Sequence, residues 1–525
     1  MVASGTVGSA DPGGSGANLA DLLRAAATRR PDTVALVDHD ASGARAAPTW
    51  AELDAAVDAA AAGIRGGLGL HPGHRVALAL ANSGAFVTAY FGALRAGLVV
   101  VPVNTGLTSH EVAQLLSDSQ AHAVFCDDST QHVVEEAVVG THRAVVDPAG
   151  LDSLVSAGRA AAGPGTGVTG GEDTALLLFT SGTSGRPKGA MLSHRALIAN
   201  IRQCGLLEPA PVAPDDVVLV VLPLFHVYGL GVLGQVTEAG ATAVLVDRFD
   251  VEATSALVSA EHVTNIPGAP PMYVAWSRRP ALAEQLRGVR VLASGAAPLP
   301  VTVSDAIRSA TGLVVHEGYG LTETAPVVTT TMASASVKPG SVGRPVPGVQ
   351  VRLVDEDGDD VADGDPGEIV VRGANLFSGY WPDGADGPDE TGWYATGDVA
   401  YADDDGDLFL VDRRKELVLV SGFNVYPREI EDVLAEHPDI AESAVIAVPD
   451  PETGEAVKAF VVPRRGSSLS PQDVLDHCAH RLARFKRPSV VVVVDGLPHS
   501  ATGKVAKGRL RAGDVGPGQT SVRPP

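Results

Sequence analysis

One stretch of the sequence, Phe179–Gly189, constrains both the fold and the chemistry of the chain. It reads Phe-Thr-Ser-Gly-Thr-Ser-Gly-Arg-Pro-Lys-Gly and follows the apolar run Ala175–Leu178, which is typical of a buried strand. Glycines let the backbone approach a ligand, and successive N–H groups in such a loop form a concavity that holds anions. Hydroxyls add donors, and Lys188 adds a charge suited to phosphate. The stretch therefore predicts a phosphate-binding loop, followed by a helix from about Ser193.

This loop differs from the nucleotide-binding loop with the pattern G-x-x-x-x-G-K-[ST]. Its lysine precedes a glycine instead of following one, and Pro187 stands directly before that lysine. Composition alone leaves open an ordinary glycine-rich surface turn.

The loop closely resembles the signature of the adenylate-forming superfamily, which includes acyl-CoA synthetases, 4-coumarate ligases, luciferases and peptide-synthetase adenylation domains. Further motifs of that superfamily occur in the expected order, and the resemblance covers roughly residues 18–511. It implies the substrates ATP, CoA and a carboxylic acid, with Mg²⁺ as cofactor. The loop residues that it implies for ATP binding are Thr180, Ser181, Gly182, Thr183, Ser184 and Lys188.

A histidine motif follows the apolar segment Val217–Leu222, which we expect to be a strand leading to a turn and a buried helix. By the resemblance, His226 lines the carboxylate pocket and helps to exclude water. The residues implied for the acyl tunnel are Val227, Tyr228, Gly229 and Gly320. A satisfied core histidine is the alternative interpretation of His226.

Two motifs after predicted strands point to the nucleotide. Small residues after Val289–Ala293 would let a flat ring lie against the backbone, and the resemblance assigns this adenine wall to Gly295, Ala296 and Ala297.

In the second motif, Tyr319 suits stacking on adenine, and Thr322 suits donation to the α-phosphate. Glu323 is a hard oxygen ligand of the kind that Mg²⁺ prefers. Glu317 and Gly318 complete the implied ATP contacts.

The remaining motifs lie toward the C-terminus. We predict Asp398 at a strand end, where its carboxylate could accept both ribose hydroxyls, and the resemblance assigns a second ribose contact to Arg413. It also makes Lys415 the hinge residue and places Ser421 and Gly422 at the CoA site.

Lys504 matches the catalytic lysine of the superfamily, whose charge would neutralise the joining carboxylate and α-phosphate. Without the resemblance, a lysine in a polar turn is usually a solvated charge. Plant 4-coumarate ligases commonly carry lysines at positions that here are Leu419 and Ser421, which leaves the CoA phosphate contacts to the candidates Arg484, Lys486 and Arg487.

Length and element rhythm predict an α/β fold. Alternating strands and helices favour helix-covered, mainly parallel sheets in a large N-terminal domain with a small β-rich subdomain, and a small α+β lid domain follows. The predicted boundaries are a disordered tail at 1–17, the AMP-binding domain at 18–411, a hinge at 412–415, the lid at 416–511 and a second disordered tail at 512–525.

Charge and cysteine content exclude several other classes. The net charge of -23, from 39 basic and 62 acidic residues, argues against nucleic-acid binding. Three widely spaced cysteines suggest neither disulfides nor zinc and favour a cytoplasmic location. Residues 1–18 lack the basic start and apolar core of a signal peptide, so none is expected. One proline (Pro223), His226 and three glycines interrupt the apolar run 217–236, so no transmembrane segment is expected.

The sequence therefore predicts an AMP-forming acyl-CoA synthetase. Because glycines follow the pocket histidine, we expect room for a medium- or long-chain fatty acid, with an aromatic acid such as coumarate or benzoate as the alternative. Transfer to a carrier protein, a non-catalytic binding protein and luciferase-like oxidation stay open as further alternatives.

Overall fold

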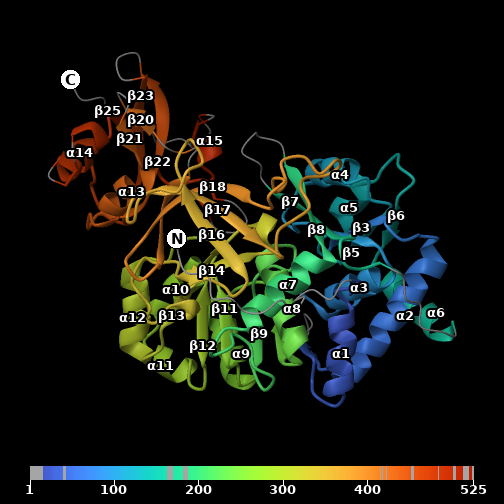
Figure 1. Ribbon diagram of the computed structural model, residues 1–525. Coiled ribbons are helices and arrows are strands. Elements are labelled where there is room, and N and C mark those ends of the chain that lie inside the picture. The colour runs from blue at the N-terminus through green and yellow to red at the C-terminus, as the bar shows by residue number, and fades with distance from the viewer. Residues whose placement is uncertain are drawn as a thin grey trace. The chain divides into compact units, whose positions relative to one another are not determined.

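The computed structural model describes most of the chain. The described residues are 16–39, 43–161, 169–180, 187–413, 416, 418–420, 423–450, 454–479, 481–482, 484–499, 504–511, 513 and 520–522. Their contacts divide them into two compact units (Figure 1). The larger unit lies within 2–351 and 371–394, the smaller within 352–370 and 395–525, and each is described by itself.

The larger unit is built on two sheets with helices on their faces (Figure 1). The first sheet has the order β6-β5-β3-β4-β7-β8 and is parallel except for the β7–β8 hairpin. Its strands are β3 (Arg75–Ala79), β4 (Val99–Pro102), β5 (Ala123–Cys126), β6 (Ala144–Val146), β7 (Thr174–Thr180) and β8 (Lys188–Ser193).

The second sheet has the order β15-β14-β13-β12-β11-β9-β10-β1-β2 and is parallel from β13 to β1. Its strands are β1 (Leu36–His39), β2 (Arg45–Ala46), β9 (Val217–Val220), β10 (Thr242–Leu245), β11 (Asn265–Gly268), β12 (Val291–Ser294), β13 (Val315–Gly320), β14 (Val327–Thr330) and β15 (Arg344–Pro345).

Helices alternate with these strands, as the sequence predicts. They are α1 (Asp21–Arg29), α2 (Trp50–Leu68), α3 (Gly84–Arg95), α4 (Ser109–Asp118), α5 (Gln131–Ala137), α6 (Pro148–Ala160), α7 (His194–Gly205), α8 (Val227–Ala239), α9 (Val251–Ala260), α10 (Pro270–Ser277), α11 (Leu282–Gln285) and α12 (Val301–Thr311). A capping box begins α2, because the Thr49 side chain accepts the Glu52 N–H and the Glu52 carboxylate accepts the Thr49 N–H.

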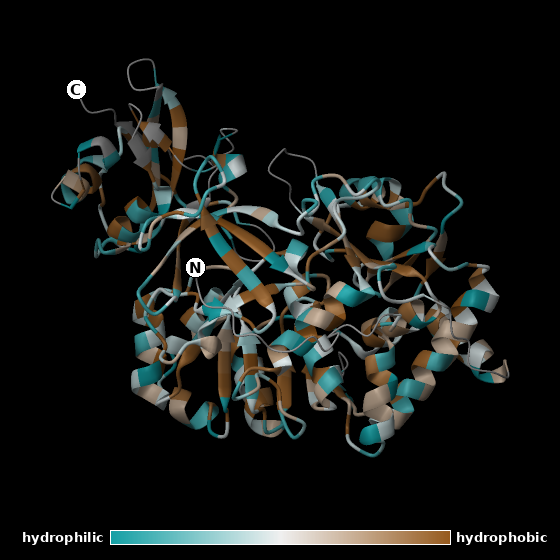
Figure 2. Cartoon of the chain, viewed as in Figure 1, coloured by the Kyte–Doolittle hydropathy of each residue, from teal (hydrophilic) through white to brown (hydrophobic). Residues whose placement is uncertain are grey.

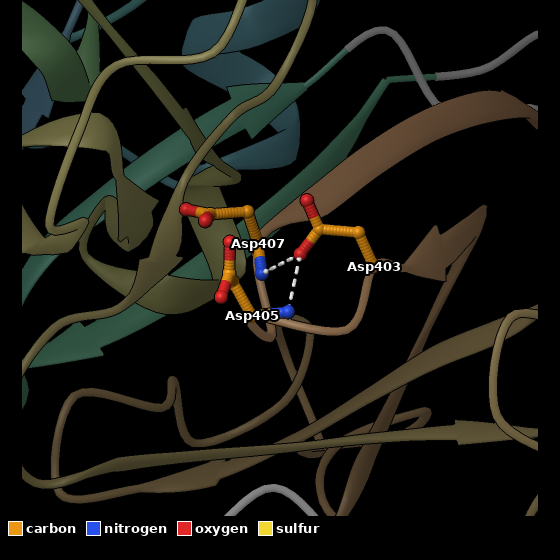
Figure 3. Close-up of side chains that lie close together, drawn as sticks. All are labelled: Asp403, Asp405 and Asp407. Carbon is orange, nitrogen blue, oxygen red and sulfur yellow. Dashed lines mark hydrogen bonds between the residues drawn. The ribbon is translucent and has the colours of Figure 1, made fainter.

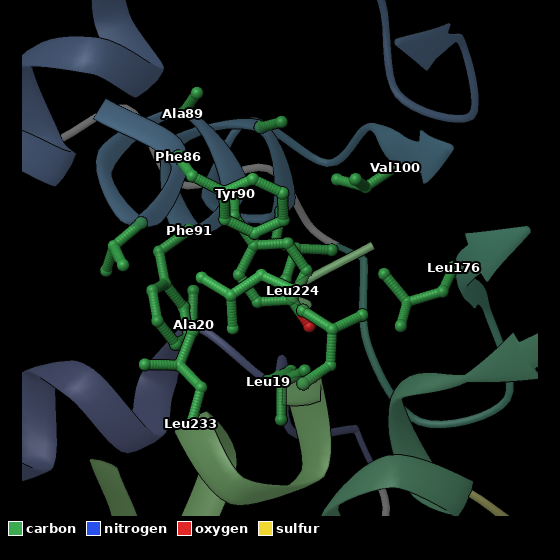
Figure 4. Close-up of a cluster of buried hydrophobic side chains, with 14 of the residues drawn as sticks. Leu19, Ala20, Phe86, Ala89, Tyr90, Phe91, Val100, Leu176, Leu224 and Leu233 are labelled. Carbon is green, nitrogen blue, oxygen red and sulfur yellow. The ribbon is translucent and has the colours of Figure 1, made fainter. Parts of the chain in front are cut away.

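One buried apolar cluster connects the two sheets. Val100 of β4 and Leu176 of β7 belong to the same buried cluster as Leu224, which follows β9, and Leu233 of α8 (Figure 4). The strands of both sheets are the most hydrophobic parts of this unit, and polar residues lie on the outer helix faces (Figure 2). Because both sheets share one core, their carboxyl edges are held in a fixed relation.

Helices α2 and α6 pack closely enough to require glycine. A Cβ atom on Gly63 would lie 2.0 Å from the Leu154 carbonyl oxygen, whereas a Cβ on Gly66 of the same helix would meet nothing within 4 Å. We therefore expect Gly63→Ala to lower the free energy of unfolding by about 1–3 kcal/mol. The matched control Gly66→Ala should raise it by up to about 1 kcal/mol. Urea unfolding measures both, and equal stabilities would contradict the packing argument.

The smaller unit contains the antiparallel hairpin β18–β19 and a C-terminal α+β region. The sheet β16-β17-β18-β19 consists of β16 (Val349–Val354), β17 (Gly367–Gly373), β18 (Tyr394–Ala402) and β19 (Leu408–Arg413). The C-terminal elements are β20 (Val418–Val420), β21 (Phe423–Val425), α13 (Pro427–Ala435), β22 (Ile440–Asp450), β23 (Gly454–Pro463), α14 (Pro471–Ala479), β24 (Val490–Val493), α15 (Lys507–Arg511) and β25 (Thr520–Val522).

The α/β class and the large-plus-small arrangement are confirmed, but the C-terminal tail prediction is wrong in part. Residues 520–522 form β25, which pairs antiparallel with β24. The reason is that β24 would otherwise leave its backbone hydrogen-bonding groups unpaired at a sheet edge. In the described part of the chain, no helix is both long and apolar enough to cross a membrane.

Candidate active site

Three predicted motifs meet at one edge of the second sheet. Strands β9, β12 and β13 run parallel, so their carboxyl ends lie on the same side. The turn that carries His226 follows β9, the segment 295–297 follows β12, and Tyr319 to Glu323 end β13 and form the next turn. Ligands of open α/β sheets bind at this edge.

His226 caps a helix at this edge. Its Nδ1 atom accepts the N–H of Tyr228 at 3.2 Å, and the half-buried ring stands at the N-terminus of α8. The turn is held by Asn82, whose amide donates to the carbonyl of Leu222 at 2.9 Å and whose Oδ1 accepts the N–H of Leu224 at 2.8 Å. Asn82 is buried after β3 of the other sheet, and sequence reasoning missed it.

The predicted acyl and adenine segments touch each other. A Cβ atom on Gly295 would lie 2.9 Å from the ring of Tyr228, so only glycine lets this ring lie against the segment. The next residue, Ala296, has a φ of 70°, a left-handed conformation that is unusual for alanine. Backbone strain of this kind concentrates at ligand-binding positions.

The end of β13 is fixed by hydrogen bonds. Glu317 accepts the N–H of Leu299 at 3.1 Å through Oε2, which fastens β13 to the segment after β12. Tyr319 is buried and pairs with Thr329 of β14. Thr322 is half-buried in the short 3₁₀ turn Thr322–Thr324.

Glu323 and Lys188 are connected through one tyrosine. Oε1 of the buried Glu323 accepts the hydroxyl of Tyr380 at 2.6 Å. The Nζ atom of Lys188 lies 5.1 Å from the centroid of the same ring and forms a 2.7 Å ion pair with Asp386. The structure thus brings the predicted metal ligand and the predicted phosphate lysine to opposite parts of one side chain.

Two glycines of the predicted acyl tunnel, Gly229 and Gly320, lie close to neighbouring backbone. A Cβ on Gly229 would lie 2.3 Å from the Pro223 carbonyl oxygen, and one on Gly320 would lie 2.0 Å from that of Pro326. Glycine at these two positions permits close backbone packing. Room for a long acyl chain beside them stays a prediction.

Most of the predicted phosphate loop lies outside the described residues, namely Ser181, Gly182, Thr183 and Ser184. Its two ends are described. Thr180 closes β7 and Lys188 opens β8, and these two residues pair across the hairpin. The strand predicted before the loop is confirmed.

In the smaller unit, the two predicted ribose contacts are register partners, because Asp398 pairs with Arg413 between β18 and β19. Asp398 is buried. The prediction that Asp398 stands at a strand end is wrong, because Asp398 lies inside β18 (Tyr394–Ala402), which is paired with β17 and with β19. The side chain of Arg413 lies outside the described part, as do Lys415, Ser421 and Gly422 entirely.

The predicted lysines of the smaller unit differ in their surroundings. Lys504 is exposed and precedes Val505, which bridges to His499. Among the CoA candidates, the Nζ atom of Lys486 lies 2.7 Å from both carboxylate oxygens of Glu429.

Three aspartates lie close together in the turn between β18 and β19. Asp403 accepts the N–H groups of Asp405 and Asp407 at 3.0 Å each, so its carboxylate closes the turn (Figure 3). These hydrogen bonds give the acidic cluster a structural role, because they stabilise the turn that connects β18 to β19.

The cysteines do not offer a nucleophile. All three are free and buried. Burial raises the pKa of the Cys126 thiol to about 11, that of Cys478 to about 11 and that of Cys204 to about 12. Thiols of this kind are inert at neutral pH, in line with chemistry that needs no protein thiolate.

Comparisons with known proteins agree with this architecture. Residues 23–381 match the AMP-binding enzyme family, and residues 429–504 match the AMP-binding enzyme C-terminal domain. The chain is 36% identical over 514 residues to a long-chain-fatty-acid–CoA ligase of Yersinia pestis (90% of this chain, 91% of that protein). It is 38% identical over 469 residues to a feruloyl-CoA synthase of Amycolatopsis sp (88% and 93%).

Among solved structures, ATP-bound MatB from Rhodopseudomonas palustris superposes with a TM-score of 0.86 at 33% identity, covering 95% of this chain and 99% of that one. The fold and the edge site define an adenylate-forming enzyme. The chain belongs to the AMP-binding enzyme family and is an AMP-forming acyl-CoA ligase that uses ATP, Mg²⁺ and CoA.

Proposed function

We propose that this acyl-CoA ligase activates a medium- or long-chain fatty acid. The observation that supports the adenylation chemistry is that His226, the Gly295 segment and Glu323 lie at the same edge of one sheet. The acid is supported by the similarity to the long-chain-fatty-acid–CoA ligase. An aromatic acid is the second candidate, because the feruloyl-CoA synthase is similarly close.

The reaction has two balanced steps. An oxygen of the acid attacks the α-phosphorus of ATP, the bond to the β-phosphate oxygen breaks, and acyl-adenylate and pyrophosphate form. The CoA thiol then attacks the acyl carbon, loses its proton and displaces AMP. Because anions meet in the first step, electrostatic stabilisation and alignment carry most of the rate enhancement.

The residues at the edge suit these demands. His226 would line the carboxylate pocket, Val227, Tyr228 and Gly229 the acyl site, and Tyr319 the adenine. Thr322 and Lys188 would contact phosphate oxygens, together with the loop 180–184.

The donor set fits the magnesium ion. Glu323 offers one buried carboxylate whose orientation is fixed by Tyr380, and Mg²⁺ is commonly held by one or two carboxylates together with substrate phosphates. Bound there, the ion would neutralise phosphate charge.

Residues of the smaller unit complete the proposal. Asp398 and Arg413 would bind the ribose, Lys504 would serve adenylation, and Ser421 and Gly422 would contact CoA. We retain the domain boundaries 18–411 and 416–511, with a turn about Lys415 separating the two half-reactions. A cytoplasmic location is proposed from the three free thiols and the need for ATP and CoA.

A panel of acids tests the substrate. We expect pyrophosphate release to be fastest with fatty acids of medium or long chain, slower with ferulate or benzoate and slowest with acetate. Preference for ferulate would establish the aromatic alternative, and preference for acetate would contradict both. Comparing thioester yield with free CoA and with a phosphopantetheine carrier protein separates the two acceptors.

A further inference from the structure

The segment 377–381 joins the two parts of the phosphate region. Its backbone pairs with β8, because the N–H of Ser378 donates to the Met191 carbonyl at 2.9 Å and the N–H of Trp381 donates to that of Gly189 at 2.8 Å. At its other end, the N–H of Phe377 donates to the carbonyl of Glu323 at 2.9 Å. The strand that begins with Lys188 and the turn that holds Glu323 are thus connected by five consecutive residues.

Tyr380 stands at the centre of this connection. Its hydroxyl donates to Oε1 of Glu323 at 2.6 Å, while its ring face lies under the ammonium of Lys188 at 5.1 Å. Phe377 packs edge to face against the same ring at a centroid distance of 5.1 Å, which restricts its rotation.

A carboxylate that ligates a metal needs a fixed direction. Glu323 is 9% exposed, and one of its oxygens is occupied by the tyrosine hydroxyl. Partners of this kind orient a ligand, and their loss typically costs 10–100-fold in metal affinity or activity. The ring beneath Lys188 adds a cation–π contact that favours one placement of the ammonium.

We propose that Tyr380 is a positioning residue that directs Glu323 toward Mg²⁺ and Lys188 toward the phosphates of ATP, so that metal and nucleotide are bound together. The inference depends on the proposed function, in which these two residues hold those groups. It assigns separate tasks to the two parts of one side chain: the hydroxyl serves the metal, and the ring serves the lysine.

Two substitutions separate these tasks. Tyr380→Phe keeps the ring and removes the hydroxyl, whereas Tyr380→Leu removes both. The matched control is Tyr401→Phe, a tyrosine that is 38% exposed and stacks on Phe409 in the β18–β19 hairpin. Calorimetry measures ATP affinity for each variant with Mg²⁺ and with EDTA, and thermal unfolding reports on folding.

We expect Mg²⁺ to strengthen ATP binding in the wild type, and Tyr380→Phe to reduce that gain about tenfold while leaving the affinity in EDTA within about twofold. Tyr380→Leu should also weaken binding in EDTA. In a Glu323→Gln background, Tyr380→Phe should have no further effect on the magnesium gain.

If Tyr380→Phe keeps the wild-type gain in ATP affinity with Mg²⁺, the inference is overturned. This holds even if the variant has a lower unfolding temperature, because the role of Tyr380 would then be structural only. If Tyr380→Phe also reduces the magnesium gain about tenfold in the Glu323→Gln background, the inference is overturned as well, because the hydroxyl would then act independently of Glu323. Failure of the proposed function gives a different result, since the wild type itself would then form no acyl-adenylate from any acid.

Discussion

Replacing Lys504 by alanine is expected to lower acyl-adenylate formation by about 10²–10³-fold or more, because the joining carboxylate and α-phosphate lose a positive charge that is favourable mainly in the transition state. Thioester formation from supplied acyl-adenylate should continue at close to the wild-type rate, because phosphate charge no longer builds up in that step. Pyrophosphate release measures the first reaction, and CoA-thioester yield measures the second.

The variant should fold normally, because Lys504 is exposed. Arg509→Ala is the matched control, since Arg509 is another exposed cation, located in α15. The control should retain both reactions. Undiminished pyrophosphate release in Lys504→Ala would remove this lysine from the proposed site, and equal loss of both reactions would point to a general binding role.

Local signals in the sequence predicted much of the fold. The predicted strand at 175–178 lies within β7, and the helix predicted from about Ser193 is α7, which begins at His194. Both depend on residues that are near neighbours in the chain. The alternation of strands and helices then determined the parallel sheets, because a crossover helix places successive strands in parallel.

Contacts between distant segments could not be predicted in the same way. Asn82 reaches Leu224 across 142 positions, and Tyr380 reaches Glu323 across 57. An asparagine after a strand and a tyrosine in a loop carry no local signal of these partners. The partners follow from the way the two sheets share a core and from the path of the segment after β17.

The glycines show what composition alone leaves open. Gly229 and Gly320 follow motif residues, and the sequence cannot distinguish a glycine that opens a tunnel from one that lets two backbone segments touch. The direction of the missing Cβ bears on the matter, and that direction is known only from the structure. The size of the acyl site is therefore better tested with substrates than inferred from glycine content.

Replacing Glu323 by glutamine is expected to lower adenylation by about 100-fold or more, because the neutral amide keeps the volume but loses the charge that would hold Mg²⁺, a contribution of several kcal/mol. The half-saturating Mg²⁺ concentration should rise, and Glu323→Asp should retain more activity than Glu323→Gln. Pyrophosphate release across a magnesium titration measures all three enzymes.

The control for this substitution is Glu356→Gln, which removes an exposed carboxylate in the turn after β16. It should leave the magnesium titration unchanged. If Glu323→Gln lowers the rate but has the wild-type half-saturating Mg²⁺ concentration, Glu323 acts by some means other than the metal. Because Glu323 is buried and joined to Tyr380, a lower unfolding temperature in the same variant would then identify its role as structural.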